Sequence, residues 1–195
     1  MAWHAALVRR APDPVNAWLG IEAERFLSVR REVRRRAGPG TAGTIADQLG
    51  VLADALIAIV EDLPDAAFRS PGGEEDWNVA QAIGHDADAR AGLSMAGALA
   101  AQGRFPADAA PVVPGVAGPP DASRDSLTRR LAVSQRIVER AARSIAGHEV
   151  DPCPLVHPLV GRLRCGEWLL FAGVHDLMHI EQLERLRASF AIARG

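Results

Sequence analysis

The sequence predicts an all-α protein, a bundle of four long helices with an extra N-terminal helix. Three observations predict this fold class. Ala, Leu, Arg and Glu are abundant and Tyr is absent, a composition that favours helix over sheet. In several long segments apolar residues recur at alternating steps of three and four, which is the spacing of one buried helix face. The chain has 195 residues, 48% of them hydrophobic, which is enough to bury one core but not two large ones.

The first 40 residues are predicted to form an N-terminal arm and helix. Residues 1–14 show no sustained period and contain two prolines, so we expect an irregular arm with Trp3 docked on the body. Residues 15–36 are predicted to be helical, and the Gly-Pro-Gly run at 38–40 ends that helix. The apolar stripe of this helix comprises Leu19, Ala23, Phe26, Val29 and Val33.

Residues 41–195 are predicted to form the four-helix bundle as a single domain. Each helix shows the repeat of a buried face, and it is most regular in the first one. Candidate N-cap residues precede the first three helices: Thr41 or Thr44, Asp76, and Asp121 or Ser123. The four helices are predicted over residues 45–63, over 77–102, from the cap at Asp121 or Ser123 to 147, and over 165–191.

The connections between these helices differ in length and composition. Residues 64–75 are predicted to turn the chain, and residues 148–164 to form a loop. The segment 103–120 contains too many prolines and glycines for a helix. It is also longer than two antiparallel neighbours need, so we expect it to cross the bundle end and let the next helix run parallel to its predecessor.

Charge and composition exclude several classes of protein. The formal net charge of −2 provides no positive field for nucleic acid or an anionic membrane. No stretch approaches the roughly 18 consecutive apolar residues of a membrane span, and the first residues lack a signal-peptide pattern, so a cytoplasmic location is expected. Two cysteines, Cys153 and Cys165, cannot form a disulfide framework and are expected to be free thiols.

Two histidines in the last predicted helix are the first candidates for chemistry. His175 and His179 stand at i and i+4, so both imidazoles lie on one helix face, close enough to share one ion. The same face carries apolar residues, and a buried imidazole costs free energy unless its nitrogens find partners. Two interpretations stay open: a metal-ligand pair, or core histidines hydrogen-bonded to backbone, Gln182 or water.

A third histidine completes a candidate metal site. His85 lies in the second bundle helix, and packing against the last helix would bring its imidazole to the same ion. Three histidines would leave coordination positions open for water and substrate. Zinc is the first expectation because imidazole suits it, with nickel or iron as alternatives, since histidine ligation does not choose the metal.

Three further residues are candidates for smaller roles. Gln182, one turn beyond His179, is expected either to hydrogen-bond a metal ligand or to pack in the core. Asp88 could orient an imidazole or accept a proton, with a solvent-facing carboxylate as the alternative. Cys165 lies at the start of a helix, where the dipole lowers a thiol pKa, so nucleophilic and structural roles are both open.

A rival motif is weaker than the three-histidine site. The run from His175 to His179 differs from the zincin signature His-Glu-x-x-His by Asp176 in place of Glu. The shorter carboxylate would hold a water about one methylene too far away. Zincins also take a third ligand downstream, and only sixteen residues follow His179. The sequence therefore argues against a protease.

Two runs of sequence resemble the DinB/YfiT-like family. Residues 77–89, in which Trp77 opens a helix and His85 follows, resemble the family's second-helix motif. Residues 157–183, which end in His-x-x-x-His followed by Gln, resemble its loop and fourth helix. The likeness covers roughly residues 41–190, and it is the linkage of the two motifs that makes it specific.

The resemblance implies a fold and a chemistry. The implied fold is a four-helix bundle with up-down-down-up topology, with a divalent metal held by His85, His175 and His179. Some family members use the metal in transfer or isomerisation with low-molecular-weight thiols such as bacillithiol or mycothiol. A small-molecule substrate is implied, and a homodimer is compatible with the resemblance. Independently of the resemblance, Arg90 and the loop residues Arg104 and Arg162 are candidate contacts for a charged cosubstrate, with ordinary exposed Arg residues as the alternative.

The sequence departs from the family pattern at two places, and a second class of function stays open. Asp86 stands where the family usually has an apolar residue, so it lies either near the site or in solvent. The N-terminal helix is also unusual for the family. The alternative function is a non-catalytic bundle that binds a small molecule or a partner, with a structural or absent metal. A structural zinc would need a fourth ligand, for which His157 and Cys165 are candidates.

Overall fold

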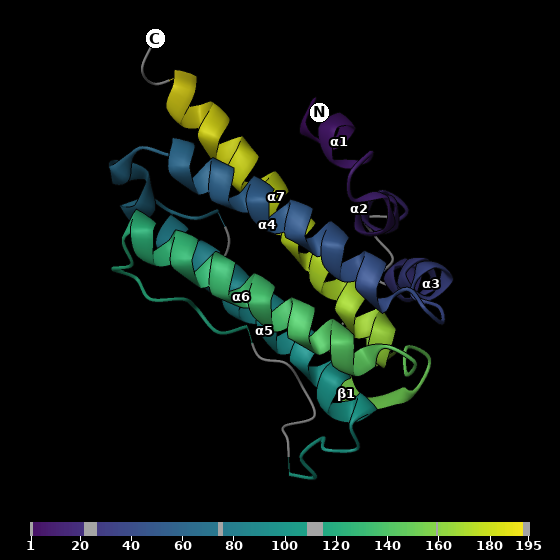
Figure 1. Ribbon diagram of the computed structural model, residues 1–195. Helices are drawn as coiled ribbons and strands as arrows, with labels where there is room; N and C mark the ends of the chain where they lie inside the picture. The colour runs from purple at the N-terminus through teal and green to yellow at the C-terminus, as the bar shows by residue number, and fades with distance from the viewer. Residues whose placement is uncertain (1, 22–26, 74–75, 109–114, 159, 193–195) are drawn as a thin grey trace.

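The computed structural model confirms the all-α fold class (Figure 1). It describes residues 2–21, 27–73, 76–108, 115–158 and 160–192. The four bundle helices are α4 (Ala42–Asp62), α5 (Val79–Ala101), α6 (Arg124–Ile145) and α7 (Cys165–Ile192). Each predicted helix end falls within one helical turn of the observed end. A one-turn 3₁₀ helix, η1 (Asp65–Arg69), lies between α4 and α5.

The bundle has the up-down-down-up topology. Helices α5 and α6 run parallel, because their N-terminal ends meet where Asn78 Nδ2 donates to Pro120 O (3.0 Å). Their C-terminal ends meet where Gln102 Nε2 donates to the Ser144 hydroxyl (2.7 Å). Helix α7 runs antiparallel to α5, since a Cβ built at Gly97 near the end of α5 would meet the carbonyl of Cys165 at the start of α7.

The connection between α5 and α6 is the reason for the parallel pair. It starts at Gly103 beyond the end of α5 and returns to the first turns of that helix, where Gly118 N donates to Gln81 O (3.0 Å). The parallel direction of α6 is therefore confirmed, but the expected path is corrected. The described residues before and after 109–114 lie at opposite ends of α5, so the connection joins the two ends of that helix instead of only crossing one end of the bundle (Figure 1).

The N-terminal prediction needs two corrections. The expected irregular arm contains helix α1 (Ala2–Leu7) and the start of α2 (Pro12–Leu19). Pro12 begins α2, because the first turn of a helix has no partner for the amide that proline lacks. The single helix predicted over residues 15–36 is instead α2, which ends at Gly20, and α3 (Leu27–Arg36). Ala23 and Phe26 of the predicted stripe lie outside the described residues.

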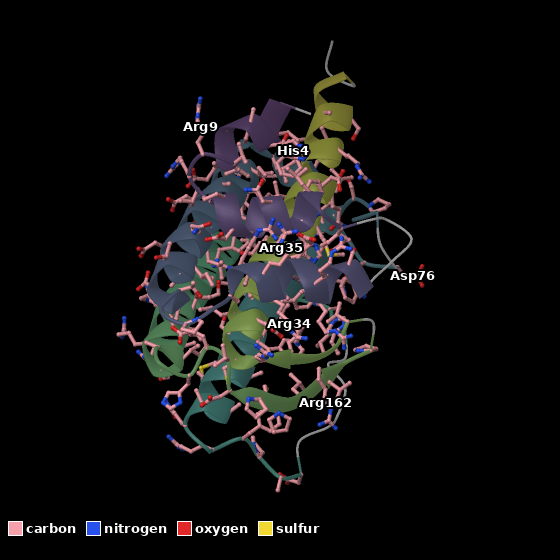
Figure 2. The ribbon with its side chains drawn as sticks, turned by 90° about the vertical axis from the view of Figure 1, so that its right-hand side faces the viewer. His4, Arg9, Arg34, Arg35, Asp76 and Arg162 are labelled. Carbon is pink, nitrogen blue, oxygen red and sulfur yellow. The ribbon has the colours of Figure 1, made fainter. Side chains whose placement is uncertain are left out.

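The N-terminal helices lie against α4 and α7. Asp13 and Gln48 exchange two hydrogen bonds of 2.7 Å, which fix the start of α2 on α4. Arg34 Nε donates to the buried carboxylate of Glu167 (2.8 Å) and fixes α3 on α7. Figure 2 shows this side of the molecule, with Arg34 and Arg35 labelled on α3. Trp3 packs against Trp18, as expected of a docked arm (ring centroids 5.5 Å apart). The division of the chain at residue 40 stays a prediction.

The segment 148–164 is not a plain loop. It contains an antiparallel hairpin of β1 (Pro152–His157) and β2 (Gly161–Arg164), in which Val156 pairs with Arg162. Cys153, Leu155 and Leu163 turn inward, so the hairpin covers the end of the bundle core. Gly161 adopts the left-handed conformation (φ 73°) that the tight turn requires.

Helix α4 has a composition that also suits a membrane span. By length and hydropathy it could cross a membrane, and it is the only helix of the described residues for which this holds. Half of its most apolar window is buried inside the bundle, including Ile45, Leu49, Leu52 and Leu56. The apolar composition is that of a core helix.

The close contact between α5 and α7 gives a first prediction. A Cβ at Gly97 would stand 2.6 Å from the Cys165 carbonyl oxygen, whereas a Cβ at Gly92 of the same helix meets nothing within 4 Å. We expect Gly97→Ala to lower the free energy of unfolding by about 1–3 kcal/mol, because backbone must move. Gly92→Ala should raise it by up to about 1 kcal/mol through helix propensity. Urea denaturation measures both, and equal effects would contradict this packing.

Candidate metal centre

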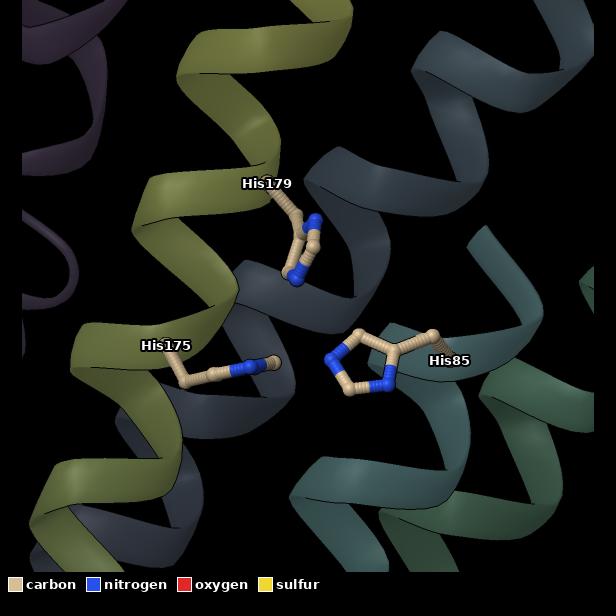
Figure 3. Close-up of side chains that lie close together, drawn as sticks. All are labelled: His85, His175 and His179. Carbon is tan, nitrogen blue, oxygen red and sulfur yellow. The ribbon is translucent and has the colours of Figure 1, made fainter. Parts of the chain in front are cut away.

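Three histidines meet between α5 and α7. His85 comes from α5, and His175 and His179 come from α7. The ring centroid of His85 lies 5.2 Å from that of His175 and 5.4 Å from that of His179, and the two α7 rings are 4.7 Å apart. One nitrogen of each ring lies within 4.8 Å of the other two. Figure 3 shows the three rings turned toward one another across the gap between the helices. A single ion could therefore contact all three.

Local structure places each ring in this cluster. The i, i+4 spacing puts His175 and His179 one turn apart on the same face of α7. On the other side, a capping box fixes where α5 begins, because Asn78 Oδ1 accepts from Gln81 N (2.8 Å) and Gln81 Oε1 accepts from Asn78 N (3.1 Å). This start places His85 opposite the α7 pair, with the Trp77 ring 5.0 Å away from it.

Each imidazole has an acceptor at its Nδ1 atom. The acceptor is Val116 O for His85 (2.9 Å) and Gln182 Oε1 for His179 (2.8 Å). For His175 it is Asp86 Oδ1, at 3.3 Å. Carbonyl and carboxylate oxygens only accept, so each Nδ1 must carry the proton. In the neutral rings, the Nε2 lone pairs are left for a shared ligand, which is the arrangement of metal-binding histidines in proteins.

Gln182 is held in its orientation by a further contact. Its amide nitrogen donates to the backbone oxygen of Gly72, which leaves its oxygen directed at His179. The residue is buried. Of the two roles open for Gln182 from the sequence, the structure places it against a candidate metal ligand.

Asp86 is buried beside the cluster. Its Oδ1 atom contacts His175, and its Oδ2 atom has no hydrogen-bond partner among the described residues. Burial disfavours its negative charge, but the hydrogen bond from His175 and the charge of Arg90 hold the pKa of Asp86 below its ordinary value. Burial also lowers the pKa of His175, although Asp86 works in the opposite direction. The ring is therefore neutral near pH 7, as ligation requires.

Another buried carboxylate lies on the other side of Asp86. Asp176 contacts Arg90 Nε with both oxygens (3.2 and 3.1 Å), and both side chains are fully buried. Burial raises the pKa of Asp176 well above its ordinary value; Arg90 opposes this rise and the nearby Asp86 adds to it. Because both oxygens of Asp176 contact Arg90 in the core, Asp176 is not placed to act as the base of a zincin-like site.

Three residues considered as functional candidates from the sequence lie away from the centre. Asp88 lies outside the centre, exposed and paired with Arg130 of α6 (2.6 Å). Arg90 is a core residue and not a contact for a charged cosubstrate. Cys165 is fully buried, and this burial, with the nearby Cys153, raises its pKa to about 12 instead of lowering it.

The candidate fourth ligands do not join the cluster. Among the described residues, the group around His175 and His179 contains His85 but neither His157 nor Cys165. His157 accepts at Nδ1 from Val160 N (3.4 Å), on the hairpin. Sequence reasoning missed the Val116 carbonyl and the Arg90–Asp176 pair. The carbonyl has no side-chain signal, and the ion pair resembles two ordinary surface charges when only the sequence is considered.

Comparison with known proteins gives one match. The family model described as the DinB superfamily matches residues 48–183. No curated protein and no solved structure matches the chain. The matched region contains the three histidines, Asp86 and Gln182, and it leaves out α1, α2 and α3.

The contact between Asp86 and His175 gives a second prediction. Removing a carboxylate that orients a metal-binding histidine usually weakens metal binding on the order of 10–100-fold. We expect this loss of zinc affinity for Asp86→Ala, measured by competition with a chromogenic chelator. Asp86→Asn keeps an acceptor oxygen and should recover most of the affinity.

The matched control is Asp88→Ala, on the same helix but paired with Arg130 in solvent. Its zinc affinity should stay within about threefold of the unchanged protein. If Asp86→Ala behaved like Asp88→Ala, Asp86 would have no part in orienting His175.

Proposed function

This chain belongs to the DinB superfamily, and on that premise we propose that it is a metal-dependent enzyme acting on a small molecule. His85, His175 and His179 hold one divalent ion. The observation that carries the proposal is the convergence of three imidazoles, each with Nδ1 engaged and Nε2 left for a ligand. Zinc fits this donor set, and nickel and iron are the alternatives.

The ligand set supports a catalytic metal over a structural one. Structural zinc sites are normally closed by four protein ligands, whereas catalytic sites have three and keep a position for water or substrate. The cluster has three histidines and no fourth member among the described residues. When bound, such an ion supplies Lewis-acid activation of a thiol, water or carbonyl.

The chemistry we favour is transfer of an electrophilic small molecule to a low-molecular-weight thiol. Neither cysteine of the chain is suited to act as the nucleophile, because burial raises the pKa of both Cys153 and Cys165. A thiol nucleophile would therefore come from solution. The role of the chain is to orient the three imidazoles through Val116, Asp86 and Gln182, so that each Nε2 is left for the ion.

The second candidate is a non-catalytic bundle that binds a small molecule or a partner protein, with a structural or absent metal. Metal-assisted hydrolysis is the alternative within the enzyme class. Neither nucleic acid nor a membrane is expected as a partner, in keeping with the net charge of −2. The homodimer and the cytoplasmic location stay predictions.

The third prediction concerns metal content. Untagged protein should carry about one divalent ion per chain by elemental analysis, and His85→Ala, His175→Ala and His179→Ala should each lose most of it. Ligation needs neutral imidazole, so retention should be complete above the ordinary histidine pKa of about 6.5 and fall as the pH drops below about 6. His148→Ala is the control, because His148 is exposed and paired with Asp151. Unchanged metal in all three variants would remove the proposal.

The fourth prediction concerns activity. Metal-loaded protein should catalyse displacement of chloride from chlorodinitrobenzene by a low-molecular-weight thiol, which forms a carbon–sulfur bond and releases chloride and the thiol proton, and His175→Ala and His179→Ala should lose this activity. Cys165→Ala should retain it, because the buried thiol of Cys165 has a pKa of about 12. The assay follows product absorbance with a panel of thiols.

Two outcomes would contradict this chemistry. Activity that survives complete metal removal, or that disappears in Cys165→Ala while the metal stays bound, would indicate catalysis by cysteine. Metal-dependent turnover of esters or amides without any added thiol would instead indicate hydrolysis.

A further inference from the structure

A pocket of about 540 Å³ lies beside the candidate metal centre, on the side of α7 that faces α2, α3 and the hairpin. His175 belongs to both sites, since it contributes to the three-histidine cluster and also lines this pocket. The volume is in the range of pockets that enclose small organic ligands. A molecule in it would lie within reach of the ring that holds the metal.

The N-terminal helices build one wall of this pocket. Trp18, Leu19, Ile21 and Val29 line it, and all four precede the region that matches the family model. The other wall comes from α7 and the hairpin. The pocket is thus made by the segment in which this chain departs from the family, laid on a helix that carries the family's histidines.

The mouth of the pocket exposes apolar side chains on both walls. Leu19 of α2 is 52% exposed and Met178 of α7 is 46% exposed. Single exposed apolar residues are ordinary, but these two line the same cavity from separate elements and add to its apolar surface. Deeper in, Phe171 packs edge-to-face against the ring of His157 (centroids 5.2 Å apart). The walls favour an apolar or aromatic body.

The charges of the lining favour an uncharged ligand. Glu181 is the carboxylate of the described lining, which contains no Arg. Arg185 pairs with Glu181 (2.7 Å) from outside the lining. A negatively charged ligand would therefore meet a carboxylate and apolar walls, both of which oppose burial of its charge. Besides Glu181, the titratable residues of the described lining are His157 and His175.

We propose that this pocket binds the apolar or aromatic body of an uncharged small molecule and places its polar end at His175. The inference deepens the proposed function, because it assigns the substrate class, and its catalytic meaning rests on that function. Binding itself does not require the metal. The pocket can therefore be tested in metal-free protein, apart from the test of the metal centre.

The experiment compares two dyes with the same hydrocarbon body. Uncharged N-phenylnaphthylamine should bind metal-free protein saturably with a rise in fluorescence. Its anionic analogue anilinonaphthalenesulfonate should bind about tenfold or more weakly. Leu19→Glu and Met178→Glu, one on each wall, should each weaken binding of the uncharged dye by about tenfold or more. Both positions are half exposed, so the fold should tolerate them, and far-UV circular dichroism checks this.

Two controls make the result decisive. Val133→Glu places the same charge at a similarly exposed position on α6 (44%), beside a different surface hollow, and should leave dye affinity within about threefold. His179→Ala should lose metal but keep dye binding. Its neighbour Met178→Glu should keep metal but lose dye binding. No saturable binding, equal loss in Val133→Glu, or tighter binding of the anionic dye would overturn the inference. If the unchanged protein failed to retain metal but bound the dyes as expected, the result would count only against the proposed function.

Discussion

The buried guanidinium of Arg90 is the interaction on which the arrangement of the bundle depends. Arg90 belongs to α5, and its guanidinium bonds to the other three bundle helices. The partners are Asp176 of α7, Ser134 and Gln135 of α6, and the carbonyl of Leu49 of α4. A buried charge is costly unless its donors are satisfied, and removing a partner of a buried pair typically costs about 3–5 kcal/mol. Any slip of one helix along another would leave part of this charge without acceptors. Arg90 therefore fixes the register of the helices.

This register also sets the geometry of the candidate metal centre. Arg90 lies five residues after His85, and Asp176 directly follows His175. Bringing Arg90 to Asp176 consequently brings His85 opposite the α7 histidines. Asp86 completes the connection, since it is buried beside Asp176 and accepts from the ring of His175. Asp86 thus links the core charges to a candidate ligand.

The sequence predicts the parts of this structure that repeat or that depend on spacing. The three-four rhythm of α4 and α6 gives their positions because a buried face repeats along the helix. The prediction fails where the outcome depends on neighbours. The first hairpin strand contains Pro152 and Pro154, which are uncommon inside strands, and the hairpin forms where it can cover the bundle end. Asp86 and Asp88 are equivalent in sequence terms, but the flanking helices α6 and α7 bury one and expose the other.

Helix α7 shows how adjacent residues can serve separate environments. Successive residues of a helix point about 100° apart, so four neighbours cover the whole circumference. His175 and His179 face α5 and the candidate ion, Asp176 faces the core charge of Arg90, and Met178 faces the pocket under the N-terminal helices. The faces that carry the histidines and Asp176 pack within the bundle that matches the family model. The face that carries Met178 would be exposed apolar surface without α2 and α3. These helices lie outside the region that matches the family model, and they make this face of α7 a wall of the pocket at His175.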